Sequence, residues 1–137
     1  MLLIDTANVV GSRPDGWWRD RAGATGRLIE RVGAATRAGR LPEPVVMVLE
    51  GAGRRAVAEG VGDDVELVHA PGQGDDTLVE LATAAGAGPV AIAPGSAETV
   101  MVVTADRALA ERLRAVGAAV VGPRWLLARL DGLGKPR

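Results

Sequence analysis

Residues 45–49 have the sequence Val-Val-Met-Val-Leu, five apolar side chains in a row. A strand with one face in water alternates polar and apolar residues, whereas a strand covered on both faces is apolar throughout. This stretch therefore predicts a central strand of a parallel sheet with helices on both faces. Shorter apolar runs elsewhere in the chain predict further strands of the same sheet at residues 2–4, 65–68, 100–103 and 119–121.

Helical patterns lie between these runs. In residues 21–38, the apolar side chains of Leu28, Val32 and Ala35 recur at the spacing that places them on one side of a helix. Similar segments predict helices at 53–60, 75–86, 107–116 and 125–130, and a minor strand at 90–93. This alternation predicts a three-layer α/β/α sandwich with a mainly parallel sheet of four or five strands. We expect one domain over residues 1–131 and a C-terminal tail over 132–137.

The composition excludes several kinds of site. The chain has no cysteine, which excludes disulfides and zinc–thiolate centres, and its one histidine, His69, excludes a metal site built on several histidines. With a net charge of −1, the protein as a whole does not attract nucleic acid electrostatically. The sequence has neither a signal-peptide pattern nor an apolar stretch long enough to cross a bilayer. We therefore expect a cytoplasmic protein without a membrane partner.

Acidic residues follow the predicted strands. Asp5 ends the first strand, Glu50 follows the second, and Asp106 follows the fourth. Asp75 and Asp76 lie after the third strand, at the start of a predicted helix. Because ligands of parallel sheets bind at the carboxyl ends of the strands, we expect these acids at one site. Clustered carboxylates repel each other, so a cation is expected among them, and all-oxygen ligands favour Mg²⁺ or Mn²⁺.

Helix capping is the alternative role for each acid, because aspartate is a favoured N-cap residue. Asp75 and Asp106 both precede a helical pattern. Asp5 differs, because it is predicted to lead through Asn8 into a long loop rather than a helix. The joint occurrence of acids at the strand ends therefore favours a metal site over a set of unrelated caps.

Three motifs, in order, resemble those of the NYN branch of the PIN-like nucleases. The opening Leu-Leu-Ile-Asp-Thr-Ala-Asn-Val-Val, residues 2–10, is similar to the first motif of that family. Gly-Asp-Asp-Thr-Leu-Val-Glu at residues 74–80 resembles its middle acidic motif. Val-Val-Thr-Ala-Asp-Arg-Ala-Leu at 102–109, followed by Gly-Ala-Ala-Val-Val at 117–121, resembles its later motif. The resemblance covers nearly the whole chain.

The resemblance implies a PIN-like fold and a metal-dependent nuclease that cuts RNA with Mg²⁺ or Mn²⁺. Asp5 would be the central metal ligand, and Asp106 a second ligand, directly or through water. A third carboxylate would come from Asp75 or Asp76, and the alignment leaves that choice open. Asn8 and Thr104 would hold ligands, water or the scissile phosphate by hydrogen bonds. The implied catalytic set is Asp5, Asn8, Asp75, Asp76, Thr104 and Asp106.

The resemblance leaves two further points open. Glu50 stands where relatives often carry an aspartate, so its role is not assigned. The oligomeric state is also open. Proteins of this kind often pair, which makes a homodimer the candidate.

The segment after the first motif is rich in tryptophan and arginine. Adjacent tryptophans flanked by arginines could stack bases and bind phosphates of a single RNA strand. The alternative is that the tryptophans fix the loop onto the body of the protein. The candidate substrate-binding residues are Arg13, Trp17, Trp18, Arg19 and Arg21.

Other functions compete with the nuclease. A phosphatase of the haloacid-dehalogenase type needs a second aspartate two positions after the first, where this chain has Ala7. A Toprim domain suits the topology, but its paired-aspartate motif is missing. The rival from another class is a catalytically weak or inactive PIN-like module for RNA binding or assembly. The filled acidic positions argue against it. The size of the chain also suits a toxin that is neutralised by an antitoxin.

Overall fold

Strands and helices alternate along the chain in the computed structural model, which describes residues 1–12, 19–51, 60–61, 64–86 and 99–131. The strands are β1 (Leu2–Asp5), β2 (Val45–Leu49), β3 (Gly60–Val61), β4 (Val65–His69), β5 (Met101–Val103) and β6 (Ala119–Val121). The helices are α1 (Thr6–Gly11), α2 (Arg21–Arg37), α3 (Gly74–Gly86), α4 (Arg107–Ala115) and α5 (Pro123–Asp131).

The strands form one sheet in the order β3-β4-β2-β1-β5-β6. Neighbouring strands run parallel, except that β3 is antiparallel to β4. In the central strand β1, Ile4 lies opposite Met47 on one side and Val103 on the other. The α/β/α fold and the mainly parallel sheet predicted from the sequence are confirmed. The two-residue strand β3 is an addition at the edge that the apolar runs did not predict.

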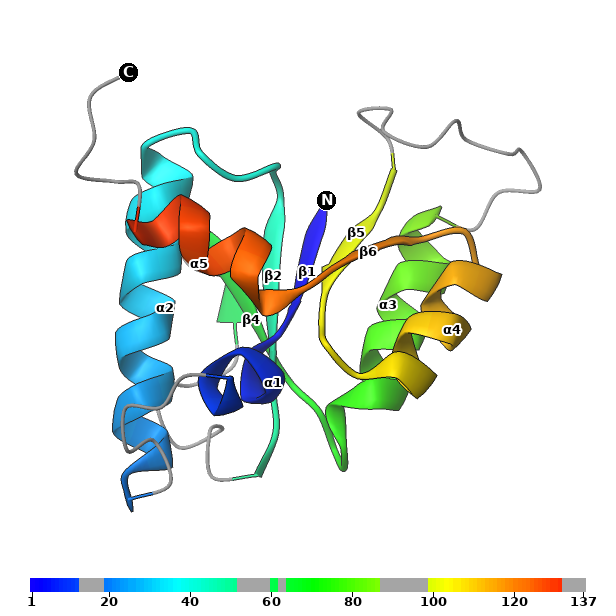
Figure 1. Cartoon of the computed structure of the whole chain (residues 1–137), viewed down its shortest axis with the longest axis horizontal. Helices are drawn as coiled ribbons and strands as arrows, with labels where there is room; N and C mark the ends of the chain where they lie inside the picture. The colour runs from blue at the N-terminus through cyan, green and yellow to red at the C-terminus, as the bar shows by residue number, and fades with distance from the viewer. Residues whose placement is uncertain (13–18, 52–59, 62–63, 87–98, 132–137) are drawn as a thin grey trace.

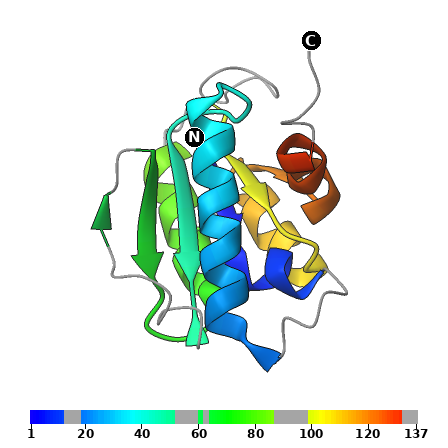
Figure 2. The ribbon, with the colours of Figure 1, turned by 90° about the vertical axis from the view of Figure 1, so that its left-hand side faces the viewer.

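Helices cover both faces of this sheet (Figures 1 and 2). Helices α1, α2 and α5 pack on one face, and α3 and α4 pack on the other. Along β1, Leu2 and Ile4 contact the first group, whereas Leu3 contacts the second. Each strand face therefore meets a helix layer, which is why the central strands carry no polar side chains before their ends.

Helix α2 forms the longest side of this core. Leu28, Val32 and Ala35 are buried against the sheet, as their spacing predicts. A fully buried leucine or valine side chain contributes about 1.5–3 kcal/mol to stability. Asp20 caps the first turn, because its side chain accepts a hydrogen bond from the backbone N–H of Gly23 at 2.9 Å. The helix therefore begins directly after Asp20.

The prediction of a loop after Asp5 was wrong. Helix α1 begins at Thr6, and Asp5 is its N-cap, with its side chain accepting a hydrogen bond from the backbone N–H of Asn8. Val9 and Val10 of this helix are buried in the core. Six residues with two adjacent valines show no helical period, so the pattern did not reveal the helix. The capping role proposed as the alternative for the other acids thus applies to Asp5 as well.

Some predicted elements lie outside the described residues. These are the helix at 53–60, apart from its last residue, the minor strand at 90–93 and the tail at 132–137. The last residue of that helix, Gly60, is in strand β3. None of the helices in the described part of the chain combines the length and the apolar composition of a membrane span.

Candidate active site

Three neighbouring strands carry an acidic residue at or just after their carboxyl ends. Asp5 ends β1, Glu50 follows β2, and Asp106 ends the short connection between β5 and α4. Helix α3 begins at the same edge and has Asp75 in its first turn. Figure 1 shows that α1, the start of α3 and the start of α4 meet at this edge of the sheet. The topology therefore gathers acids that lie as much as a hundred residues apart in the sequence.

Asp5 is the most buried of these acids, with 7% of its surface exposed. Burial raises the pKa of its carboxyl group from the usual 3.8 to about 6. Hydrogen bonds from Thr104 and from the backbone of Asn8 act in the opposite direction, because they stabilise the charged form. The negative charges of Glu50 and Asp75 contribute to the rise as well. The charged form of Asp5 therefore lowers the stability of the folded protein at neutral pH.

Thr104 connects Asp5 to Asp106. Its hydroxyl donates to Oδ2 of Asp5 at 2.9 Å, and its oxygen accepts from the backbone N–H of Asp106 at 3.2 Å. Asp106 in turn caps α4, because its Oδ1 accepts from the backbone N–H of Leu109 at 3.1 Å. The buried hydroxyl of Thr104 therefore fixes both the orientation of the Asp5 carboxylate and the start of the loop that carries Asp106.

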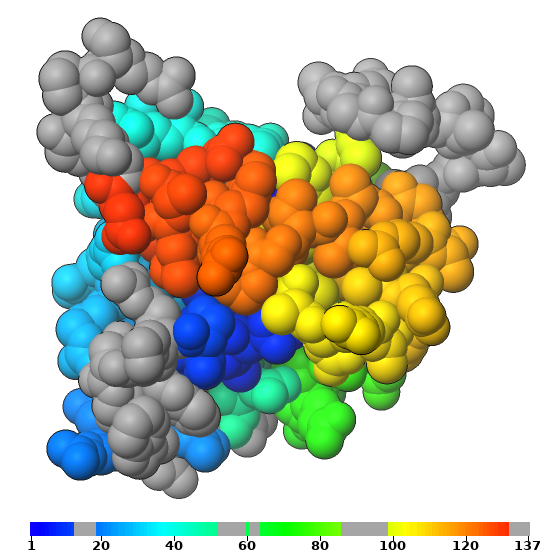
Figure 3. Space-filling model, viewed as in Figure 1, coloured from blue at the N-terminus to red at the C-terminus, as the bar shows by residue number. Residues whose placement is uncertain are grey.

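Asn8 holds the same loop from the other side. Its side-chain oxygen accepts a hydrogen bond from the backbone N–H of Ala105 at 2.9 Å. This bond ties α1 to the connection between β5 and α4. In the space-filling view, α1 (dark blue) lies directly against this connection (yellow), on the front of the molecule (Figure 3). The side chain of Asn8 is thus a structural link between the helix that follows Asp5 and the connection that carries Asp106.

The Thr104 hydroxyl gives a testable stability effect. We expect Thr104→Val to lower the free energy of unfolding by about 1–3 kcal/mol, because a buried carboxylate oxygen loses its donor. Thr104→Ser keeps the hydroxyl and should lose less. Urea denaturation of both variants at neutral pH checks this, and a valine variant as stable as the wild type would contradict the hydrogen-bond role.

Glu50 has a structural contact that its sequence position did not reveal. Its Oε2 accepts a hydrogen bond from the backbone N–H of Gly74, at the start of α3. A Cβ atom at residue 74 would lie 2.9 Å from this oxygen, so glycine is what allows the close approach. Glu50 thereby fixes the beginning of α3, and with it Asp75, against the end of β2.

Asp75 and Asp76 occupy different surroundings. Partial burial raises the pKa of Asp75, Asp106 and Glu50 raise it further, and Arg112 lowers it. Asp76 instead is exposed and forms an ion pair with Arg112 of α4 at 2.8 Å. Of the two adjacent aspartates, Asp75 lies among the acids of the strand ends. Arg112 was missed by sequence reasoning, because nothing in the sequence relates it to a residue 36 positions earlier.

The acids suit a hard cation by their chemistry. Carboxylate oxygens are the ligands that Mg²⁺ and Mn²⁺ prefer. Within the described ranges, however, no three acidic or histidine side chains converge closely enough to share one ion. Mg²⁺ is commonly bound by one or two carboxylates and keeps several waters. The set therefore fits a water-rich ion held by one or two carboxylates, and does not fit an ion enclosed by protein ligands.

The candidate substrate-binding residues are only partly described. Arg13, Trp17 and Trp18 lie outside the described residues. Arg19 and Arg21 are exposed on either side of the cap at the start of α2. This end of α2 lies toward the edge where the acids gather (Figure 1).

Two crystal structures of Rae1 (YacP) from Bacillus subtilis are similar to this chain. One, a tryptophan-to-leucine mutant, has a TM-score of 0.69 and 21% identity, over 95% of this chain and 74% of that one. The other has a TM-score of 0.68 and 20% identity, over 96% and 73%. Neither a family model nor a curated protein matches the sequence. At this identity, the likeness shows a shared α/β fold.

Proposed function

We propose that the chain is a metal-dependent ribonuclease of the NYN branch of the PIN-like proteins, which hydrolyses RNA phosphodiester bonds with Mg²⁺ or Mn²⁺. The observation that carries this proposal is the carboxylate of Asp5 at the end of the central strand, whose pKa is raised by its burial and by the negative charges of Glu50 and Asp75. Such a cluster lowers the stability of the protein on its own, and a bound cation would reverse that loss.

Each residue of the site has a distinct role in this proposal. Asp5 and Asp106 would hold the ion, and Asp75 would contact it through water. When bound, the ion would activate water and stabilise the charge that develops on the phosphate. Thr104 keeps the Asp5 carboxylate aimed by its hydrogen bond, and Asn8 keeps the loop of Asp106 closed against α1. Asp76 is the weaker candidate of the adjacent pair, because its carboxylate is paired with Arg112.

The fold likeness and the motif order support RNA as the substrate. Arg19 and Arg21 are candidates for contacts with its phosphates, as are the undescribed Arg13, Trp17 and Trp18. The substrate roles of all five residues stay predictions. A cytoplasmic location and a homodimer are likewise proposals, and gel filtration combined with light scattering would decide the second.

One observation favours the alternative function. Because no three acids of the described chain converge on a point, the scaffold also suits an RNA-binding or assembly module with weak or no catalysis. In that case the acids would serve as helix caps, as Asp5 and Asp106 do in this structure. RNA binding without cleavage would distinguish this module from the ribonuclease.

Metal-dependent cleavage is the first expected result. Purified protein incubated with labelled single-stranded RNA should cut it in Mn²⁺ or Mg²⁺ and should leave it intact in EDTA, because the carboxylates alone offer no partner for the charge on the phosphate. Restoring the metal after EDTA should restore cleavage. Equal cleavage with and without EDTA would contradict the proposed mechanism, and no cleavage in either metal would favour the binding module.

A further inference from the structure

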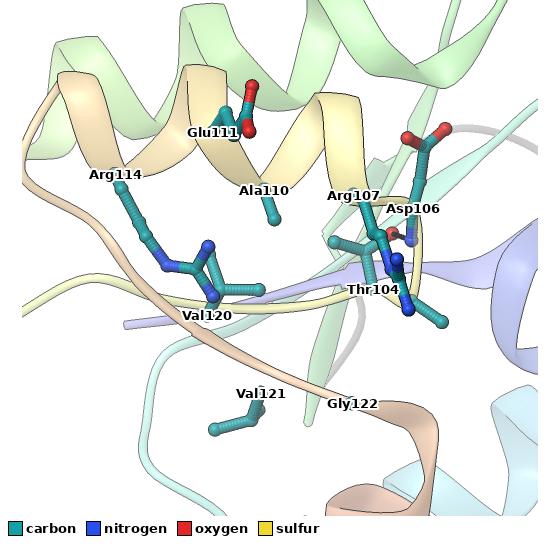
Figure 4. Close-up of a pocket in the computed structure, with 10 residues that line it drawn as sticks. Thr104, Asp106, Arg107, Ala110, Glu111, Arg114, Val120, Val121 and Gly122 are labelled. Carbon is teal, nitrogen blue, oxygen red and sulfur yellow. Dashed lines mark hydrogen bonds between the residues drawn. The ribbon is translucent and has the colours of Figure 1, made fainter.

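A pocket of about 400 Å³ lies beside the acidic site, between α4, β6 and the start of α5 (Figure 4). It begins at the β5–α4 connection, with Thr104 and Asp106 on its wall. The half-buried residues Val120 and Val121 of β6, an edge strand of the sheet, also line it. Its wall on α4 includes Ala110, whose methyl group leaves the space open.

Two arginines of α4 border this pocket. Arg107 and Arg114 are seven residues apart, about 10.5 Å along the helix, and so lie on the same side of it two turns apart. Figure 4 shows both guanidinium groups extending toward β6, whereas the carboxylate of Asp106 points away from them. Both side chains are exposed, and neither forms an ion pair within the described part of the chain.

We propose that this pocket binds the phosphates of the RNA strand next to the bond that is cut, with Arg107 and Arg114 each contacting a different phosphate. The proposal takes RNA as the ligand from the proposed ribonuclease function. It does not require that the protein cleaves the RNA. An exposed arginine without an ion-pair partner keeps its donors for a ligand, and the planar guanidinium matches a phosphate. The two residues are about 10.5 Å apart along the helix, whereas a duplex carries one phosphate per strand for about every 3.4 Å of its axis, so we expect the two residues to reach separate phosphates.

The position of the connection between β5 and α4 supports a continuous path for the RNA strand across both sites. At the connection between β5 and α4, the carboxylate of Asp106 points to one side, and the pocket with Arg107 and Arg114 lies on the other (Figure 4). A strand that crosses this connection would therefore place one phosphate at Asp106 and Asp5 and later phosphates beside Arg107 and Arg114. Glu111 also lines the pocket, but its carboxylate points away from the two guanidinium groups (Figure 4).

The test measures RNA binding without cleavage. A labelled single-stranded RNA is titrated with the Asp5→Asn variant, and fluorescence anisotropy is followed from about 50 to about 200 mM salt. Arg107→Gln and Arg114→Gln are then added to this background. The control, matched in charge, carries Arg37→Gln and Arg40→Gln at and just after the C-terminal end of α2, where Arg37 also loses its exposed ion pair with Asp64. Circular dichroism confirms that each variant is folded.

We expect the pocket double substitution to weaken binding at least about tenfold, because two charge-assisted phosphate contacts are lost. The slope of log K against log salt should fall in magnitude by about 1.4, about 0.7 for each phosphate lost from a single strand. The control pair should leave the slope within about 0.3 of the parent. In an otherwise wild-type chain, KM should rise more than kcat falls.

The outcomes separate this subsite from the ribonuclease activity. If the pocket double substitution leaves the affinity and the slope unchanged, or if the control pair weakens binding as much, the subsite is wrong even where the wild type cuts RNA. If the wild type never cuts RNA but the pocket arginines carry the expected loss, the subsite stands and only the ribonuclease fails.

Discussion

Asp5→Asn is expected to lower RNA cleavage by more than about a hundredfold while the protein stays folded. Asparagine keeps the size of the side chain but removes the negative charge that a cation needs at the centre of the site. Substitution of residues that merely support a metal ligand already costs about 10–100-fold in metal affinity or activity, so loss of the central ligand should exceed this. Initial rates with single-stranded RNA in saturating Mn²⁺ measure the effect.

Two further variants sharpen this result. Asp106→Asn should also abolish cleavage, and its fold should persist, because asparagine caps a helix about as well as aspartate. Asp76→Asn is the matched control: it removes one negative charge from the same edge, but from a side chain that is exposed and paired with Arg112. Its rate should stay within about threefold of the wild type, since exposed ion pairs contribute little. Equal losses of activity in all three variants would show that cleavage depends on net charge and not on the position of the acids. An active Asp5→Asn variant would contradict the proposed site.

The strands and long helices could be predicted because their burial requires a recognisable pattern of apolar residues in the sequence. Residues 45–49 are apolar throughout because helices cover both faces, and Leu28, Val32 and Ala35 recur because one side of α2 meets the sheet. Helix α1 shows no such pattern, because it is shorter than two turns. Its stability comes from the cap at Asp5 and from the buried Val9 and Val10. A short helix of this kind depends on its tertiary contacts more than on its own pattern.

The acidic edge was predictable, but its internal connections were not. Acids after consecutive parallel strands must lie at one edge, whatever the loops do. Which hydrogen bonds they form depends on contacts that only the folded chain creates: Glu50 with the backbone of Gly74, and Thr104 with Asp5. The distinction between Asp75 and Asp76 has the same origin, because it depends on where Arg112 of α4 stands relative to the first turn of α3.

In the absence of metal, Asp5→Asn is expected to be more stable than the wild type at neutral pH. The carboxyl group titrates at its usual 3.8 in the unfolded chain and at about 6 in the folded one. Between these values the folded state binds the extra proton, so the contribution of Asp5 to stability is highest below about pH 4 and is lost as the pH rises through about 6. The full loss above that pH amounts to about 3 kcal/mol.

The variant should lack this loss, because an amide does not ionise. It offers one acceptor oxygen in place of two for Asn8 and Thr104, which removes about 1 kcal/mol and leaves a net gain of about 2 kcal/mol above pH 6. Below about pH 4 the two proteins should differ by less than about 1 kcal/mol. Urea denaturation across the pH range tests this, with Asp76→Asn, whose carboxylate is exposed, as the control that follows the wild type.

Added Mg²⁺ or Mn²⁺ should then reverse the order. A cation that binds the folded state stabilises the wild type in proportion to the logarithm of its concentration, and it has no comparable site in Asp5→Asn. The variant should therefore unfold at the same urea concentration with and without metal, whereas the wild-type midpoint moves upward. If Asp5→Asn is instead less stable than the wild type at every pH, and metal shifts neither protein, Asp5 serves only as a helix cap for α1 and the acidic edge holds no ion.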